Sequence, residues 1–310
     1  MGIDGFKRLY HDADRRESPA TVAVAGGDDP TVLEAMRIAC DSGWIRPMLV
    51  GPEPQIRELA ATIQIDLDDF IIHHASGDAI AAAAVTLVRT GQAQALMKGQ
   101  ITTPTLMKAV LHHDLGLRTG RVVCQVVLME IPRDRRRFLL ADTGISVQPS
   151  LDERADILRS TVDVAEALWA TSPKVALMAA TETIKPSMPE TVEAAEMVRR
   201  NQQGELAHCQ IEGPLSFDLA YAADAGAKKQ VEGSVVGAAD IMLFPNLLSA
   251  NLTVKAIMYT ADCKFGGVLR GTAAPVVFMS RADTTETRLN SLALTLRILD
   301  HQASCQIPDH

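Results

Sequence analysis

Residues 275–289 read PVVFMSRADTTETRL, and this stretch decides how the chain is interpreted. The apolar run after Pro275 is typical of a buried strand, and it ends at Ser280 and Arg281. Apolar residues then recur at helical spacing, at Leu289, Leu292, Ala293, Leu296 and Leu299. A joint between a strand and a helix presents unpaired backbone N–H groups and the positive end of a helix dipole. The pattern therefore predicts an anion site, at which Arg281 could grip a phosphate with two parallel hydrogen bonds.

An ordinary helix start explains the same residues. Ser280 and Asp283 have the spacing of a capping box, and so do Asp283 and Glu286. Both interpretations stay open on this stretch alone.

Length and composition narrow the class of protein. The 310 residues exceed the usual size of one hydrophobic core, so two domains are expected. No apolar run is long enough to span a membrane, and residues 1–10 carry charge without a signal-peptide core. We therefore expect a cytoplasmic protein with no membrane partner.

Cysteines and charge exclude further classes. The five cysteines are scattered and form no Cys-x-x-Cys pair, which indicates reduced thiols rather than disulfides or a zinc site. A formal net charge of −8 with few aromatic residues argues against nucleic acid as a partner. An anionic ligand would need a local cluster of cations.

Short apolar strands alternate with amphipathic helices along the chain, which predicts an α/β fold built on parallel strands. The predicted strands cover residues 21–25, 47–50, 70–74, 93–97, 174–179, 207–211 and 240–244. The predicted helices cover residues 5–16, 30–42, 53–63, 78–89, 150–170, 189–200, 217–229 and 248–262. Two longer strands, 122–131 and 138–141, are separated by the charge run 133–137, which indicates a solvated hairpin turn. Composition marks no domain boundary.

Ligand-binding loops of parallel sheets lie beyond the carboxyl ends of the strands. Residues 26–29 read GGDD after the first strand, and Asp29 is interpreted as a helix cap rather than part of a dinucleotide fingerprint. Lys98 and Gly99 end a later strand, where lysine would supply charge and glycine would allow close backbone approach to a ligand. Thr102 and Thr103 could donate hydrogen bonds to that ligand, or one of them could cap the next helix.

Two more strand ends carry polar side chains. Asp142 follows the strand that ends near residue 141, where a carboxylate is usually part of a turn. Asn251 follows the strand that ends near residue 244, and its amide could bind a ligand or the backbone. The chain contains no His-Glu-x-x-His motif, Walker loop or Gly-x-Ser-x-Gly motif. Asp218 and Asp224 lie six residues apart, a spacing that does not favour a shared metal.

Taken together, the strand-end motifs resemble the phosphate acetyl/butyryl transferases, with the butyryl branch the closer match. The motifs occur in the family's order, roughly over residues 20–300: MKG at 97–99, GLRTG at 116–120, GPL at 213–215, GSVVGAAD at 233–240 and SRAD at 280–283. The specificity of the resemblance lies in the ordered set rather than in any single motif.

The resemblance implies reversible acyl transfer between coenzyme A and inorganic phosphate, without a metal or redox cofactor. Its substrates would be acyl-CoA, phosphate and acyl phosphate, with an acyl group of three to five carbons, and the protein would be a homodimer. The implied fold is that of isocitrate and isopropylmalate dehydrogenases, two α/β domains with a cleft between them. By this analogy residues 1–121 and 274–310 form domain I, and residues 122–273 form the inserted domain II.

The resemblance also implies roles for single residues. Ser280 would donate to the reacting centre and Arg281 would hold phosphate, together with Thr102 and Thr103. This chain departs from the acetyl branch at two positions. Met107 or Lys108 stands where that branch has an arginine, and Thr287 stands where it has an aspartate. Asp283 or Glu286 could serve as the base instead, or the base could be Asp142.

Two other functions are alternatives for this sequence. A metal-dependent NAD(P) dehydrogenase of the same fold would need a carboxylate cluster and a nicotinamide site, and the sequence shows neither. A non-catalytic subunit that binds coenzyme A or acyl phosphate would bind its ligand without releasing thiol.

Overall fold

A computed structural model describes residues 5–169, 172–278 and 283–305, and the chain divides into two compact units. Unit 1 comprises the described parts of Met1–Arg121 and Phe265–His310, and unit 2 comprises those of Val122–Lys264. The first division between the units follows residue 121, and the second precedes residue 265, because a strand over 264–270 pairs within unit 1. The domain bounds that the resemblance implies stay a prediction.

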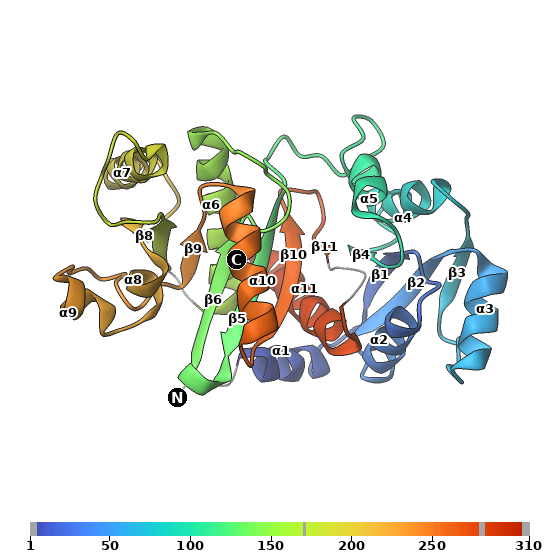
Figure 1. Ribbon diagram of the computed structural model, residues 1–310. Helices are drawn as coiled ribbons and strands as arrows, with labels where there is room; N and C mark the ends of the chain where they lie inside the picture. The colour runs from blue at the N-terminus through green and yellow to red at the C-terminus, as the bar shows by residue number, and fades with distance from the viewer. Residues whose placement is uncertain (1–4, 170–171, 279–282, 306–310) are drawn as a thin grey trace, which may run out of the picture. The chain divides into compact units, whose positions relative to one another are not determined.

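Unit 1 alternates strands and helices (Figure 1). Its strands are β1 (Ala20–Ala25), β2 (Ile45–Gly51), β3 (Ile71–His74), β4 (Ala95–Lys98), β10 (Lys264–Arg270) and β11 (Val276–Val277). Its helices are α1 (Gly5–Asp14), α2 (Pro30–Asp41), α3 (Glu53–Thr62), α4 (Ala79–Arg89), α5 (Thr103–Val110) and α11 (Thr285–Cys305).

The unit 1 strands lie in the order β3-β2-β1-β4-β11-β10. All neighbours are parallel except β10 and β11, which are antiparallel. Apolar side chains of β1 and β4 are fully buried, as the continuous apolar runs of a parallel sheet require. Helices α1 and α2 pack against α11, and α4 packs against α5 (Figure 1).

Unit 2 is also α/β. Its strands are β5 (Cys124–Ile131), β6 (Arg136–Ala141), β7 (Lys174–Met178), β8 (Gln210–Leu215) and β9 (Ile241–Leu243), in the order β5-β6-β9-β7-β8. Its helices are α6 (Leu151–Leu168), α7 (Pro189–Gln202), α8 (Phe217–Tyr221), α9 (Ala225–Lys229) and α10 (Leu247–Thr260). Strands β5 and β6 form an antiparallel hairpin, and the other neighbours are parallel. The hairpin turn, with a short 3-10 helix η1 (Pro132–Asp134), confirms the prediction for the charge run.

Local capping explains where several helices begin. Asp29 accepts a hydrogen bond from the Val32 N–H and caps α2, as predicted. Thr102 caps α5 by accepting from Thr105 N–H, and Asn246 caps α10 in the same way. A capping box formed by Ser150 and Glu153 starts α6. These short-range signals are readable in the sequence because donor and acceptor lie within three residues.

Two predicted elements differ clearly in extent from the structure, and one strand was not predicted. The helix expected over 217–229 is two short helices, α8 and α9, because the chain is extended at Ala222 and Gly237 packs against Ala223. Strand β8 covers Gln210–Leu215 rather than 207–211. Strand β10 was missed, because the glycines at 266 and 267 interrupt its apolar pattern.

Asp142 organises the turn after β6. Its carboxylate is 4 % exposed, and Oδ1 accepts hydrogen bonds from the N–H groups of Gln125 (2.9 Å), Gly144 (3.0 Å) and Ile145 (3.2 Å). Oδ2 accepts from the N–H of Ser146 at 2.7 Å. The charge is buried and well bonded, an arrangement that makes the removal of either partner costly.

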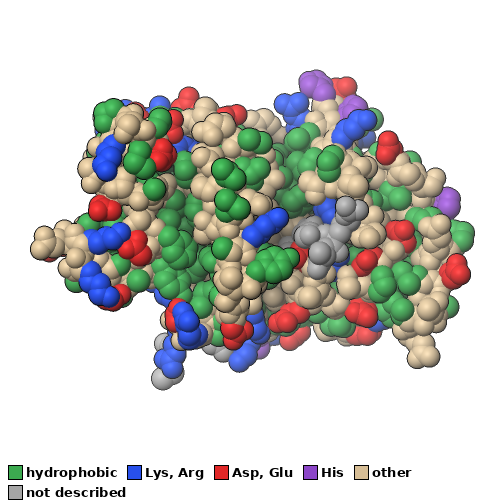
Figure 2. Space-filling model, viewed as in Figure 1, with side chains coloured by type: hydrophobic (Ala, Val, Ile, Leu, Met, Phe, Trp, Pro, Cys, Tyr) green, Lys and Arg blue, Asp and Glu red, His purple; other side chains and the backbone are tan. Residues whose placement is uncertain are grey.

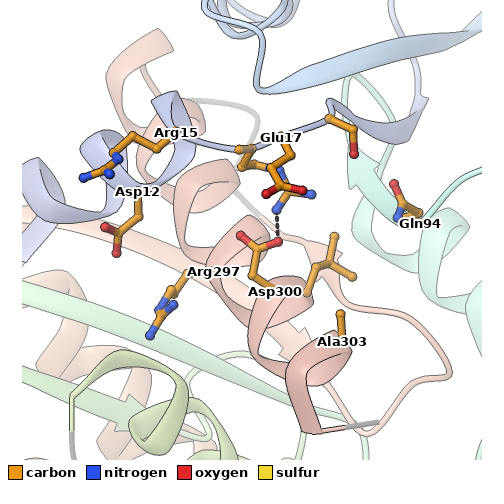
Figure 3. A pocket seen from close by; sticks show the side chains of 10 residues that line it. Asp12, Arg15, Glu17, Gln94, Arg297, Asp300 and Ala303 are labelled. Atoms are coloured by element: carbon orange, nitrogen blue, oxygen red, sulfur yellow. Dashed lines mark hydrogen bonds and ion pairs between the residues drawn. The ribbon is translucent and has the colours of Figure 1, made fainter. Parts of the chain in front are cut away.

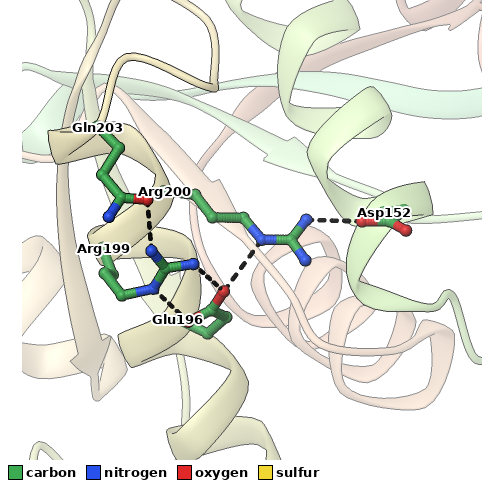
Figure 4. Close-up of polar contacts among 5 residues, drawn as sticks. All are labelled: Asp152, Glu196, Arg199, Arg200 and Gln203. Atoms are coloured by element: carbon green, nitrogen blue, oxygen red, sulfur yellow. Dashed lines mark hydrogen bonds and ion pairs between the residues drawn. The ribbon is translucent and has the colours of Figure 1, made fainter.

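A contrasting network joins α6 and α7 at the surface (Figure 4). Arg199 and Arg200 both bond to Glu196, and these bonds, that of Arg199 first, lower the pKa of Glu196 to about 2. Arg200 also reaches Asp152 at 2.6 Å, but the Asp152 side chain is 83 % exposed. Exposed pairs of this kind contribute little to stability.

We expect Asp142→Asn to destabilise the protein, because an amide cannot accept all four backbone N–H bonds. The free energy of unfolding should fall by about 2–4 kcal/mol, the scale for charged hydrogen bonds and a buried donor left unpaired. The urea midpoint measures the change. The matched control is Asp152→Asn, which should shift the midpoint little, and equal midpoints for both variants would refute the role given to Asp142.

Candidate active site

Strands β1, β4 and β11 end at the same edge of the unit 1 sheet. Ala25 pairs with Lys98, and Met97 pairs with Val277, in parallel register. The carboxyl ends of these strands therefore lie side by side, although β11 is far from β1 and β4 in the sequence. This edge is where the strand-end rule places ligand-binding loops.

Lys98 and Gly99 lie at this edge in close contact with the first loop. Lys98 is 2 % exposed, and its Nζ lies 3.5 Å from the Gly99 carbonyl oxygen. The N–H of Gly99 donates to Ala25 O, and that of Gln100 donates to Gly26 O. A Cβ on Gly99 would lie 1.9 Å from the Gly26 oxygen, so the missing side chain allows two backbone segments to pack together. Binding of a ligand by these residues remains a prediction.

The first turn of α5 carries the two predicted hydroxyls. Thr102 and Thr103 are exposed, and the Thr102 hydroxyl is the helix cap, the alternative that the sequence left open. Lys108 lies in the last turn of α5 and is exposed. An exposed helix start with a capping threonine remains compatible with an anion, since it leaves other N–H groups available.

Helix α11 begins after the predicted catalytic segment. Ser280 and Arg281 lie outside the described residues, so their geometry stays a prediction. Thr284 accepts a hydrogen bond from the Thr287 N–H at 3.2 Å. The Thr284 hydroxyl therefore caps the start of α11, and the capping boxes predicted for Ser280, Asp283 and Glu286 stay predictions. Asp283 is half-buried and Glu286 is exposed.

Sequence reasoning missed Arg288, which lies on the first turns of α11. Its side chain is fully buried, and its Nε donates to the Thr31 hydroxyl at 3.0 Å. Burial lowers the pKa of Arg288, and the charges of Asp29 and Asp283 oppose only part of that shift. The available signal was helical spacing, because Arg288 precedes Leu292 by four residues and so shares the buried face of the helix.

The predicted residues of unit 2 are bonded to their own unit. Asp142 uses both carboxylate oxygens to bind backbone N–H groups. Asn251 lies on α10, and its amide donates to the Thr143 carbonyl oxygen at 3.1 Å. Both side chains thus order the turn after β6, and their predicted part in substrate binding remains untested.

A hollow of about 770 Å³ lies at the opposite edge of unit 1, near the starts of β1 and β4 (Figure 3). Its lining combines arginines with carboxylates, and Arg16 forms an ion pair with Asp300 there. Arg297 also faces this hollow. The balanced charge and the position at the amino ends of the strands do not match the predicted phosphate site.

The described residues also bear on whether the chain offers a metal site or a cysteine nucleophile. They include no cluster of three or more His, Cys, Asp or Glu side chains that could hold a metal. Asp218 pairs instead with Lys229 at 2.8 Å. Burial raises the pKa of the Cys209 thiol to about 12, which disfavours a nucleophilic thiolate.

Two further observations concern large partners. No helix within the described part of the chain is long and apolar enough to cross a membrane. On the face shown in Figure 2, Lys and Arg side chains are interspersed with Asp and Glu.

Comparisons with known proteins identify the family of this chain. The family model described as phosphate acetyl/butaryl transferase matches residues 74–296. The chain is 41% identical to the phosphate butyryltransferase of Clostridium acetobutylicum, over 88% of this chain and 91% of that protein. It is 35% identical to the phosphate acetyltransferase of Thermotoga maritima, over 88% of this chain and 93% of that protein.

Solved structures of other proteins resemble this one in fold. A branched-chain phosphotransacylase from Enterococcus faecalis matches with a TM-score of 0.78 and 31% identity, over 90% of this chain and 99% of that one. A 4-hydroxythreonine-4-phosphate dehydrogenase from Klebsiella pneumoniae matches with a TM-score of 0.53 at 10% identity, over 91% of this chain and 100% of that one, and shows a likeness of fold alone. The motifs, the α/β architecture and the relatives agree, and the chain belongs to the phosphate acetyl/butyryl transferase family.

Proposed function

We propose that this enzyme transfers a short-chain acyl group reversibly between coenzyme A and inorganic phosphate, with a preference for acyl groups of three to five carbons. The phosphate acyltransferase activity rests on the family and on its named relatives. The single observation that supports the chain length is the 41% identity to a phosphate butyryltransferase over most of both chains. The likeness to a branched-chain phosphotransacylase fits the same range.

The proposed reaction forms one bond and breaks another at the carbonyl carbon of the acyl group. The coenzyme A sulfur attacks the carbonyl carbon of the acyl phosphate, and a C–S bond forms. The C–O bond to the phosphoryl group breaks, phosphate leaves with the electron pair, and the thiol proton passes to a base. The reverse course consumes acyl-CoA and phosphate. Catalysis therefore needs a base, donors for the developing oxyanion and cations for the phosphate.

Residues of unit 1 can supply these groups in our proposal. Ser280 donates to the reacting centre, and Arg281 holds the phosphate. The hydroxyls of Thr102 and Thr103 and the charge of Lys98 assist at the sheet edge. The supporting observation is the parallel register, which sends the segments after β4 and β11 to one edge.

The base is proposed to be Asp283 or Glu286. Asp283 lies just before α11, and Glu286 lies in the first turn of α11, where it is exposed. Asp142 is less suited, because its carboxylate is buried and both of its oxygens already accept hydrogen bonds from backbone N–H groups.

The proposal also covers the domain arrangement, the oligomeric state, the location and the cofactors of the enzyme. We propose the isocitrate and isopropylmalate dehydrogenase-like arrangement, two α/β domains with a cleft, and a likeness of fold to another dehydrogenase supports it. We also propose a homodimer in the cytoplasm that uses no metal or redox cofactor, with coenzyme A as substrate.

Mixing the enzyme with NAD or NADP and a hydroxy acid should therefore give no reduced nicotinamide.

Thiol release is the direct test of the function. Acyl-CoA of two to five carbons is incubated with phosphate, and free coenzyme A is followed with a thiol reagent. We expect phosphate-dependent release with the highest kcat/KM between three and five carbons. A maximum at two carbons would refute the chain-length proposal, and absence of release with every acyl-CoA would refute the activity.

Ser280→Ala tests the proposed oxyanion donor. Turnover should fall by at least about 10²-fold, the scale for loss of one such donor. Ser304→Ala is the matched control, because Ser304 is an exposed residue near the end of α11. Turnover of Ser280→Ala equal to that of the control would remove Ser280 from the mechanism.

A further inference from the structure

Arg288 has buried donors that the described chain does not satisfy. Its side chain is fully buried, and Nε donates to Thr31 Oγ1. The two terminal nitrogens, Nη1 and Nη2, are shielded from solvent and have no hydrogen-bond partner within the described residues. A buried charge without acceptors is strongly unfavourable, so the arrangement indicates that an acceptor is supplied from outside.

The Asp29 carboxylate, which lies close to Arg288, already accepts other hydrogen bonds. Asp29 Oδ1 lies 3.9 Å from Arg288 Nη2, which is beyond hydrogen-bond distance. The same oxygen accepts from the Thr31 hydroxyl at 2.6 Å and from Val32 N–H at 3.1 Å, as the cap of α2. Asp29 therefore attracts the guanidinium at a distance but does not bond to its terminal nitrogens.

Two helix starts meet at this guanidinium. Thr285, the first residue of α11, donates from its hydroxyl to Glu34 of α2 at 2.8 Å. Thr31, in the first turn of α2, receives the Arg288 Nε–H. The positive ends of both helix dipoles thus lie beside a buried cation. The combination favours a doubly charged oxyanion over a neutral ligand.

We propose that Nη1 and Nη2 of Arg288 bind a phosphate oxyanion, that of inorganic phosphate or of the phosphoryl group of acyl phosphate. The proposal rests on the proposed function and adds a substrate-binding residue to it. It also supplies the planar fork that is absent from α5, where Met107 and Lys108 stand and Lys108 is a point charge. Because both nitrogens are shielded here, binding requires a small displacement of the surrounding groups.

Steady-state kinetics of the full chain test the assignment. With butyryl-CoA and inorganic phosphate as substrates, Arg288→Met should raise the KM for phosphate by at least about tenfold, the scale of one charge-assisted hydrogen bond. The KM for butyryl-CoA should change by less than about twofold. Arg288→Lys should restore only part of the loss, because an ammonium group lacks the fork geometry.

The matched control is Arg297→Met, the same substitution on the same helix. Arg297 faces the hollow at the opposite edge of unit 1, so the KM for phosphate should stay at the wild-type value. A thermal unfolding assay provides a readout besides activity. Inorganic phosphate should raise the melting temperature of the wild type and of Arg297→Met more than that of Arg288→Met.

A third variant keeps the test decisive if Arg288→Met fails to fold. Thr31→Val removes the oxygen that holds Nε but leaves the charge, and it should raise the KM for phosphate about threefold, less than loss of the whole fork. Unchanged phosphate KM in Thr31→Val and Arg288→Lys overturns the assignment. A raised KM for butyryl-CoA with an unchanged phosphate KM also overturns it, since the anion would then be a phosphate of coenzyme A. Absence of thiol release from the wild type would instead refute the proposed function.

Discussion

The parallel register of β1, β4 and β11 is the constraint on which unit 1 depends. It places Ala25, Lys98 and Val277, the last residues of these strands, at one sheet edge, although more than 170 positions separate the last two. Backbone packing reinforces the register, because Gly99 lets the segment after β4 contact the carbonyl of Gly26. A side chain at Gly99 would separate these segments, so the shape of the edge follows from the absence of one carbon atom.

Two buried charged side chains, Asp142 and Arg288, differ in how many of their hydrogen bonds the protein itself supplies. Asp142 has four backbone donors on its carboxylate, and its burial is fully explained by the turn that it orders. Arg288 has one acceptor for Nε, and its two terminal nitrogens have none within the described chain. The carboxylate of Asp142 therefore needs no ligand. The terminal nitrogens of Arg288 can still donate hydrogen bonds to an oxyanion, and binding of that oxyanion would recover the stability lost by burying them without acceptors.

The charge of the protein makes such local arrangements necessary. With a formal net charge of −8, the chain as a whole repels phosphate and coenzyme A. Attraction must therefore come from cations and helix starts gathered in a small volume, where water and salt screen them poorly. Lys98, almost fully buried at a strand end, and Arg288, buried between two helix starts, have this character.

The sequence by itself determined the α/β class, most strand and helix positions, the hairpin and the family, because these depend on local periodicity, short-range capping and an ordered set of motifs. It identified Asp29 as a cap and offered Thr102 or Thr103 as the cap of α5, since each acceptor lies within three residues of its donor. Tertiary structure alone decided the partners of Arg288, because Thr31 lies 257 positions away and no local pattern joins them. It also decided the pairing of β10 with β11, which no periodicity in a glycine-interrupted strand could reveal.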